Sequence, residues 1–462
     1  MIDLCNIRYV RLGTAAIAAA LLAGCAAPPR SLDASGAARR TATELLALQP
    51  GAIRYAMTSN EGERTVYATE VATMRASFAL PPGDEADERL PAALDTALHF
   101  NVDLDVARER LIAALARAAG RAPRWQRGVL TAAHALLGPE AAPHIEPLLP
   151  ELRTPREFAI AAYTLLRVAD NALTRQTIRS VMQRNFADAA QEPRLRALDA
   201  RLRDEPSVPR PPLADLLATP PRAGFPTLYS LQRKDRAHAG LALVRGADGR
   251  FVRHPDGSMF AVAQYALARS NLPGTITNGN TPQGVFVVKG TGSATNRWIG
   301  PTPYIESMLP IEAPFALFDD PTQRDALPAL DDAARRASWS EAAYLSLLPA
   351  SWREWWPLRE AWLAGLAGRD EILAHGNAIN TDYYRGERFY PTAPSAGCLV
   401  AAERWSGGDG TLVQSDQLAL VQAFVAGGRD VGYLIVVELD DAARAVTLAD
   451  VADAIAAAEA RR

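Results

Sequence analysis

Cysteine and histidine are scarce in this sequence of 462 residues, which contains three cysteines and six histidines. The histidines lack the paired spacing of metal ligands, and three cysteines are too few for a thiolate zinc site. The sequence therefore predicts neither a metal centre nor a cofactor.

An excess of positive charge is also missing, because the formal net charge at pH 7 is -3. Proteins that bind nucleic acid usually carry a basic patch or stripe that neutralises phosphates. No such stripe stands out here, so nucleic acid is not an expected partner.

The apolar run Leu12–Gly24 follows Arg8 and Arg11 and is too short for the roughly 20 residues of a membrane-spanning helix. Basic residues before a short apolar run are typical of a secretion signal. The run leads into L-A-G-C at residues 22–25, which resembles a bacterial lipobox. This resemblance implies cleavage before Cys25 and lipidation of Cys25; the alternative is an ordinary secretion signal.

Residues 1–24 are therefore predicted to be a lipoprotein signal peptide, and residues 25–40 a tether rich in Ala, Pro, Ser and Arg. Several acyl chains, each contributing about 0.8 kcal/mol per buried CH₂, hold a protein on a membrane. Ala26 rather than aspartate follows Cys25. By resemblance to Gram-negative lipoproteins, this implies a periplasmic protein anchored in the outer membrane.

Residues 41–204 have an almost continuous helical period, and predict an all-α domain. Apolar residues such as Leu111 and Leu115 recur at the spacing of amphipathic helices. Pro-Arg pairs begin at residues 123, 155 and 193, and their separations of about 32 and 38 residues fall in the range of HEAT-like helical hairpins. Such hairpins are expected either to be a platform that binds a protein partner or a glycan, or to form a bundle that only spaces the next domain.

Prolines are dense between residues 205 and 225, which predicts a linker crossed in extended form. From there to residue 440 the pattern is mainly β. Runs at 241–245, 259–267, 285–288 and 433–438 are expected to be strands. Residues 441–462 are expected to form a C-terminal helix.

Cys398 is the cysteine that these assignments leave unaccounted for. Cys5 leaves with the signal peptide and Cys25 is committed to lipid, so Cys398 has no partner for a disulfide within its own chain. A lone thiol retained in an exported protein suggests a chemical use. The alternative is a small buried cysteine, because free cysteine is among the most buried residue types.

His375-Gly376 lies about 23 positions before the run S-A-G-C-L at residues 395–399. An imidazole that takes the thiol proton turns Cys398 into a good nucleophile, so His375 is the expected base. Backbone N–H groups around Ala396 and Gly397 are expected to hold the oxyanion of an acyl transfer. The alternative is a histidine unrelated to the cysteine.

These two motifs follow T-P-Q-G-V-F at residues 281–286, and the order T-P-x-G-x-F, H-G, S-x-G-C resembles the L,D-transpeptidase catalytic domain of the YkuD type. The resemblance covers roughly residues 226–440. It implies a mainly β catalytic domain that acts on the peptide stems of peptidoglycan through Cys398 and His375.

The sequence departs from the family at two positions. Family members commonly have a histidine directly after the serine and an arginine or asparagine two positions after the cysteine, where this sequence has Ala396 and Val400. Contacts that the family makes with a substrate carboxylate from the second position are therefore not carried over.

Substrate-binding candidates between the base and the nucleophile are Ser395, Gly376, Asn377, Tyr383, Tyr384 and Arg385. Arg385 is a candidate for binding a stem carboxylate, because a guanidinium matches a carboxylate in bidentate fashion. The alternative is an exposed, solvated arginine.

Residues 298–370 are predicted to be a helical insertion, and they hold six of the eight tryptophans of the chain. Such a segment before the base resembles the capping subdomains of larger family members. Its aromatic rings either close over the cleft to face sugar rings and stem peptides, or pack inward as a small core.

The sequence as a whole predicts a lipid-anchored cysteine acyltransferase that remodels the cell wall. Its expected partners are peptidoglycan stem peptides, the membrane and a protein bound to the helical domain. Two alternatives stay open: a carboxypeptidase or amide hydrolase on the same fold, and a scaffold that binds peptidoglycan without catalysis.

Overall fold

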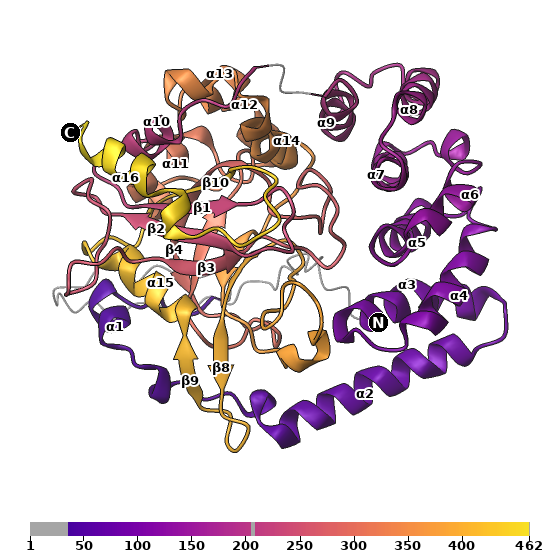
Figure 1. The fold of residues 1–462 in the computed structure, drawn as a ribbon, viewed down its shortest axis with the longest axis horizontal. Coiled ribbons are helices and arrows are strands. Elements are labelled where there is room, and N and C mark those ends of the chain that lie inside the picture. The colour runs from indigo at the N-terminus through magenta and orange to yellow at the C-terminus, as the bar shows by residue number, and fades with distance from the viewer. Residues whose placement is uncertain (1–35, 205–207, 462) are drawn as a thin grey trace, which may run out of the picture.

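The computed structural model describes residues 36–204 and 208–461 (Figure 1). A helical region extends to about residue 218, and a mixed β region with a closed eight-stranded barrel and helices follows it. This agrees with the predicted order of a helical part before a mainly β part. The predicted signal peptide, Cys25 and most of the tether lie outside the described residues.

The first described segment packs on the barrel and not on the helical array. Arg39 forms an ion pair of 2.6 Å with Glu306, and both side chains are buried. Helix α1 (Ala42–Ala47) starts with a capping box between Thr41 and Glu44, and its Leu45 packs in the barrel core. The first helix thus follows the predicted start at residue 41, and the helices that pack on one another as an array begin with α2.

The helical array contains α2 (Asn60–Ala79), α3 (Asp84–Phe100), α4 (Leu104–Leu115), α5 (Pro123–Leu136), α6 (Ala142–Ile145), α7 (Pro155–Val168), α8 (Ala172–Asn185) and α9 (Pro193–Leu202). Each predicted Pro-Arg pair starts a helix, because proline at the first turn lacks only an N–H that would have no intrahelical partner. Helices α3, α5, α7 and α9 form a row on the side of the barrel (Figure 1).

A short helix, α10 (Leu213–Ala218), occupies the segment predicted to be an extended linker. Leu216 and Leu217 are fully buried there, in the core that α10 shares with the barrel and with the C-terminal helix α16 (Ala452–Glu459). The linker prediction is wrong for these residues, because apolar burial fixes a helix turn between two proline clusters.

The barrel consists of β1 (Thr227–Gln232), β2 (Gly240–Arg245), β3 (Val262–Tyr265), β4 (Gly284–Gly292), β5 (Tyr304–Met308), β6 (Leu373–His375), β7 (Leu399–Ala401) and β10 (Gly432–Glu438). Around the barrel the order is β1-β10-β4-β5-β6-β7-β3-β2. The pairs β1–β10 and β6–β7 are parallel, and the others are antiparallel. A separate ribbon joins β8 (Glu403–Trp405) to β9 (Leu412–Ser415).

Alternation along the strands sends side chains into two cores. Val285 and Val287 of β4 pack with α10 and with helices of the tryptophan-rich segment. Phe286 and Val288 pack instead with α15 (Asp416–Val425), because successive side chains of a strand point to opposite faces. Both faces of β4 are therefore buried.

Strand β5 lies inside the range predicted to be a helical insertion. It pairs with β4 on one side and with β6 on the other, so the barrel requires it. The predicted insertion is wrong for these residues. The helices of the segment all follow β5: α11 (Phe315–Asp319), α12 (Asp332–Ala337), α13 (Glu341–Leu345) and α14 (Glu360–Leu366).

The tryptophans of this segment mostly pack inward. Trp339, Trp352 and Trp362 are at most 8% exposed, and all three belong to one core with barrel strands. The prediction of a small inward-facing core is confirmed for these residues. These three side chains do not present exposed aromatic faces over a cleft.

Candidate functional site

The barrel places the predicted base and the predicted nucleophile on two neighbouring parallel strands. His375 is the last residue of β6, and Cys398 directly precedes β7; the register pairs Ala374 with Leu399 and His375 with Val400. Continued by one residue, this register puts Cys398 beside Leu373, two positions before His375. The backbone N–H of Leu373 donates to Cys398 Sγ at 3.4 Å.

Ser395 closes the turn that carries the sulfur. Its Oγ accepts the N–H of Gly397 at 2.9 Å and donates to the carbonyl of Cys398 at 2.8 Å. Gly397 has a φ of 117°, which residues with a side chain rarely adopt. Ser395 is therefore a structural residue of this turn, and its binding role stays a prediction.

Thr281 connects the third motif to the same turn. Its Oγ1 donates to the carbonyl of Gly397 at 2.9 Å, across 116 positions of sequence. Pro282 and Gln283 then lead into β4. The structure thus brings together all three stretches that the sequence singled out.

The oxyanion prediction fits the structure only in part. The N–H of Gly397 is engaged by Ser395 Oγ, so an oxyanion at that group requires that this bond be replaced. Ala396 is exposed, next to the half-buried Cys398.

His375 is buried, and its Nδ1 bonds the carbonyl oxygen of Gly376. A carbonyl only accepts, so Nδ1 carries the proton and Nε2 has the lone pair of a base. Burial lowers the pKa of His375 to about 4, against the opposing effect of the Gly376 carbonyl. The ring is neutral at pH 7, which suits proton acceptance but does not supply positive charge beside the thiol.

Glu403 is a buried carboxyl that the sequence did not single out. It accepts the N–H of Asn377 at 3.0 Å and the hydroxyl of Ser415 at 2.7 Å. Burial raises its pKa to about 7, and these hydrogen bonds oppose the rise. A Cβ at Gly376 would lie 2.1 Å from the carboxyl carbon, so glycine is required where this carboxyl meets the chain after the base.

Asn377 is also part of this turn. Its side chain accepts the N–H of Ile379 at 2.9 Å, and its carbonyl accepts the indole N–H of Trp405 at 2.9 Å. Gly376 and Asn377 therefore shape the chain after the base, and contact of either with substrate stays a prediction.

Tyr383 and Tyr384 face the helical region. Tyr383 stacks on Tyr67 of α2 with ring centroids 5.1 Å apart, and the hydroxyl of Tyr384 donates to the carbonyl of His99. Both rings thus pack against helices far away in sequence, and contact of either with substrate stays a prediction. Arg385 is exposed and pairs with Asp382 at 2.8 Å, as the alternative of a solvated arginine expected.

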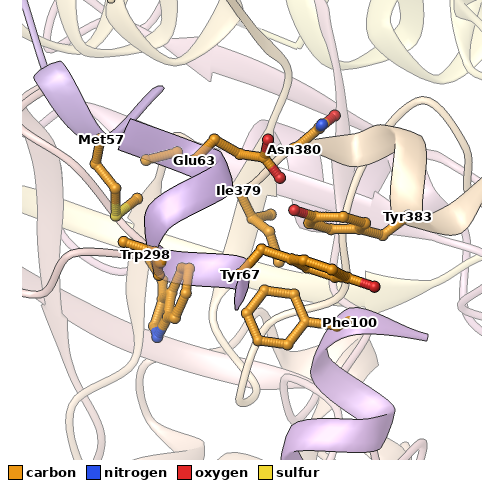
Figure 2. Close-up of a pocket in the computed structure, with 10 residues that line it drawn as sticks. Met57, Glu63, Tyr67, Phe100, Trp298, Ile379, Asn380 and Tyr383 are labelled. Atoms are coloured by element: carbon orange, nitrogen blue, oxygen red, sulfur yellow. The ribbon is translucent and has the colours of Figure 1, made fainter. Parts of the chain in front are cut away.

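A small cavity lies beside these rings (Figure 2). Tyr67 and Phe100 reach it from the helical array, and Trp298, Ile379 and Tyr383 from the barrel side. Its cavity volume of about 10 Å³ has room for about one water molecule. We therefore interpret it as an imperfection of an aromatic interface and not as a substrate site.

Within the part of the chain that the structure describes, no three His, Cys, Asp or Glu side chains gather as a metal site. In the same residues, no helix is both long and apolar enough to cross a membrane.

Comparison with protein-family models, with curated proteins and with solved structures gave no match.

Proposed function

We propose that this chain is an L,D-transpeptidase-like cysteine acyltransferase that acts on peptidoglycan stem peptides. One observation carries the proposal: His375 ends β6 and Cys398 directly precedes its parallel neighbour β7, with Thr281 bonded to the turn before the sulfur. Three motifs far apart in sequence meet there, in the order that resembles the family.

The reaction uses groups of this site. Nε2 of His375 takes the thiol proton, and Cys398 Sγ attacks the carbonyl carbon of an amide in a stem peptide. The C–N bond then breaks, the leaving amine receives the proton from His375, and a thioester to Cys398 stays. Attack of an amine on the thioester gives a joined product, and attack of water gives a shortened stem.

The neutral state of His375 supports this assignment of roles. A base must hold a lone pair at the working pH, and burial of the ring keeps its pKa near 4. Val400 is buried and paired in register with His375, so this part of the site is apolar.

We also propose that the helical part is a HEAT-like array of helical hairpins. The row α3, α5, α7 and α9 supports it, as do the prolines that start three of these helices. We propose that the outer face of the array binds a protein partner.

The proposed location is the periplasmic face of a Gram-negative outer membrane, with Cys25 as the lipidated residue. The lipobox resemblance and the short apolar run before it support this location.

Incubation of the protein with disaccharide-tetrapeptide fragments, followed by mass spectrometry, tests the activity. A joined product identifies transpeptidation and a shortened stem identifies hydrolysis. Binding of peptidoglycan by Cys398→Ala, with no product from the wild type, would instead favour the scaffold.

A further inference from the structure

Arg369 is a buried cation directly beside the turn that carries Cys398. It lies between α14 and β6 and is 4% exposed. Its guanidinium donates to backbone carbonyls of two segments: Gly274, Asn280 at 2.7 Å, Gly279 at 2.7 Å, Ile276 at 3.4 Å and Gly397 at 3.3 Å. Arg369 therefore joins the loop at residues 274–280 to the residue that precedes the nucleophile.

The partners of Arg369 differ from those of the equally buried Arg233. Arg233 is 1% exposed and pairs with Asp440 and Asp450, whereas no described carboxylate forms a salt bridge with Arg369. A buried charge without a direct ion-pair partner is costly, so its retention calls for a reason.

The group whose charge most favours the Arg369 guanidinium is the thiolate of Cys398. Burial lowers the pKa of Arg369 to about 10, and attraction to Cys398 is the first of the effects that oppose this, ahead of Glu360 and Asp370. Such an attraction is mutual: a cation favoured by a thiolate also favours the thiolate.

The backbone around Arg369 brings this cation against the residue that precedes Cys398. A Cβ at Gly397 would lie 2.1 Å from Nη2 of Arg369, so the absence of a side chain admits the guanidinium. Glu371, two residues after Arg369, has a φ of 54°, and its carbonyl lies 3.5 Å from Cys398 Sγ. Its N–H donates to Glu312 at 3.2 Å, which holds this unusual conformation.

The loop that surrounds the guanidinium is itself held by the helical array. Leu272 and Ile276 are buried in the core of the array, and Nε2 of His134 bonds the carbonyl of Asn271 at 3.3 Å. Contacts with the helical array thus hold the loop whose carbonyls bind the guanidinium.

We propose that Arg369 is the positioning residue of the nucleophile: its guanidinium fixes Gly397 against the 274–280 loop and places a permanent positive charge beside Cys398. His375 is neutral at rest and provides no such charge. The proposal rests on the assignment of Cys398 as the nucleophile, and it assigns the thiolate-favouring charge to Arg369 and proton transfer to His375.

The pH dependence of Cys398 alkylation tests the charge directly. Iodoacetamide is reacted with the full chain from about pH 5 to 10, and the adduct is quantified by mass spectrometry on the peptide that contains Cys398. The wild type is expected to react with a midpoint below the roughly 8.5 of a free cysteine. Arg369→Gln is expected to raise this midpoint by about one to two pH units, and Arg369→Lys to raise it less.

Arg233→Gln is the matched control, because Arg233 is equally buried but lies among Asp440, Asp450 and the carbonyls of Arg444 and Ala445. Its loss is expected to lower stability without moving the midpoint. A folded Arg369→Gln with the wild-type midpoint would overturn the proposal, and so would a wild-type midpoint near 8.5.

His375→Ala decides the matter if Arg369→Gln does not fold. A midpoint that stays low in His375→Ala supports Arg369 as the source of charge, and a midpoint that rises to that of a free cysteine contradicts it. Failure of the proposed function has a different signature. A shifted midpoint in Arg369→Gln without stem turnover by the wild type supports the role of Arg369 and rejects the proposed activity. Stem turnover by the wild type with an unshifted midpoint in Arg369→Gln supports the activity and rejects the role of Arg369.

Discussion

At the scale of single residues, Gly397 joins backbone geometry to the chemistry of the site. Its φ of 117° is unfavourable for other residues, and a Cβ there would lie 2.4 Å from the carbonyl oxygen of Gly279 as well as against Arg369. Gly397→Ala is therefore expected to lower the free energy of unfolding by about 1–3 kcal/mol and to slow alkylation of Cys398. Urea unfolding and iodoacetamide labelling measure the two effects.

Gly386→Ala is the control for this change. Gly386 also has a positive φ, of 94°, but nothing lies within 4 Å of the Cβ that alanine would add. It shares the backbone strain and lacks the collision with Arg369. Equal effects of the two substitutions would show that the close approach at Gly397 does not matter.

The pKa of His375 gives a prediction about pH. In the proposed reaction the neutral ring is the base, so kcat/KM is expected to fall as pH falls through the pKa of His375 in the free protein. With that pKa at about 4, the acid limb of kcat/KM for stem peptides is expected near pH 4. An acid limb near the ordinary value of about 6.5 would contradict the buried, neutral ring.

The same shift contributes to stability with a definite sign. The folded pKa of about 4 lies below the unfolded value of about 6.5, so the unfolded chain binds the additional proton between them. The contribution of His375 is complete above about pH 6.5 and is lost as pH falls toward 4.

At the scale of elements, local signals in the sequence identified much of the fold. Alternation and β-branched residues located β2, β3, β4 and β10, and prolines located the starts of α5, α7 and α9. Strand β5 escaped because its Glu306 and Ser307 contradict an apolar strand. Glu306 is buried because Arg39 and Lys289 pair with it, and such partners cannot be read from the strand itself.

Part of the site was also predictable from local signals in the sequence. His375, Cys398 and Thr281 stand in short motifs, and the structure places all three motifs together. Arg369 and Glu403 stand in no motif, and their importance depends on neighbours that only folding supplies. The partners of Tyr383 and Tyr384 could not be predicted for the same reason, since they belong to α2 and α3.

The segment between His375 and Cys398 is expected to depend for its stability on its aromatic contacts with the helical array. Tyr383→Ala removes the stack on Tyr67 and the edge contact with Phe100 at 5.3 Å. We expect a loss of about 1–3 kcal/mol and faster amide hydrogen exchange across residues 376–394. Hydrogen exchange followed by mass spectrometry measures this.

Tyr390→Ala is the control, because Tyr390 belongs to the same segment but is 37% exposed. Unchanged exchange in Tyr383→Ala would mean that the segment is held without the helical array.

At the scale of the whole molecule, the two regions interlock around the site. Leu272 and Ile276 of the barrel region belong to the core of the helical array, and ion pairs join Asp95 to Arg269 at 3.4 Å and Arg196 to Glu341 at 3.0 Å. The array thus supports the loop that holds Arg369. A partner bound to the outer face of the array would therefore bind helices that support this loop.

The membrane anchor gives a prediction at this scale. Wild-type protein is expected to sediment with membranes, and Cys25→Ala to be soluble or unprocessed, because lipid on Cys25 supplies the membrane affinity. Fractionation and mass spectrometry of the N-terminal peptide measure both properties. Wild-type protein free in the periplasm with an unmodified Cys25 would refute the anchor.

The central claim is that Cys398 accepts an acyl group. A carbapenem, whose strained amide needs only a nucleophile, a base and an oxyanion site, tests it on the intact full-length chain by mass spectrometry. The account predicts one added carbapenem mass, located at Cys398 and absent in Cys398→Ala. A folded wild-type protein that gains no mass, or gains the same mass in Cys398→Ala, would contradict the account.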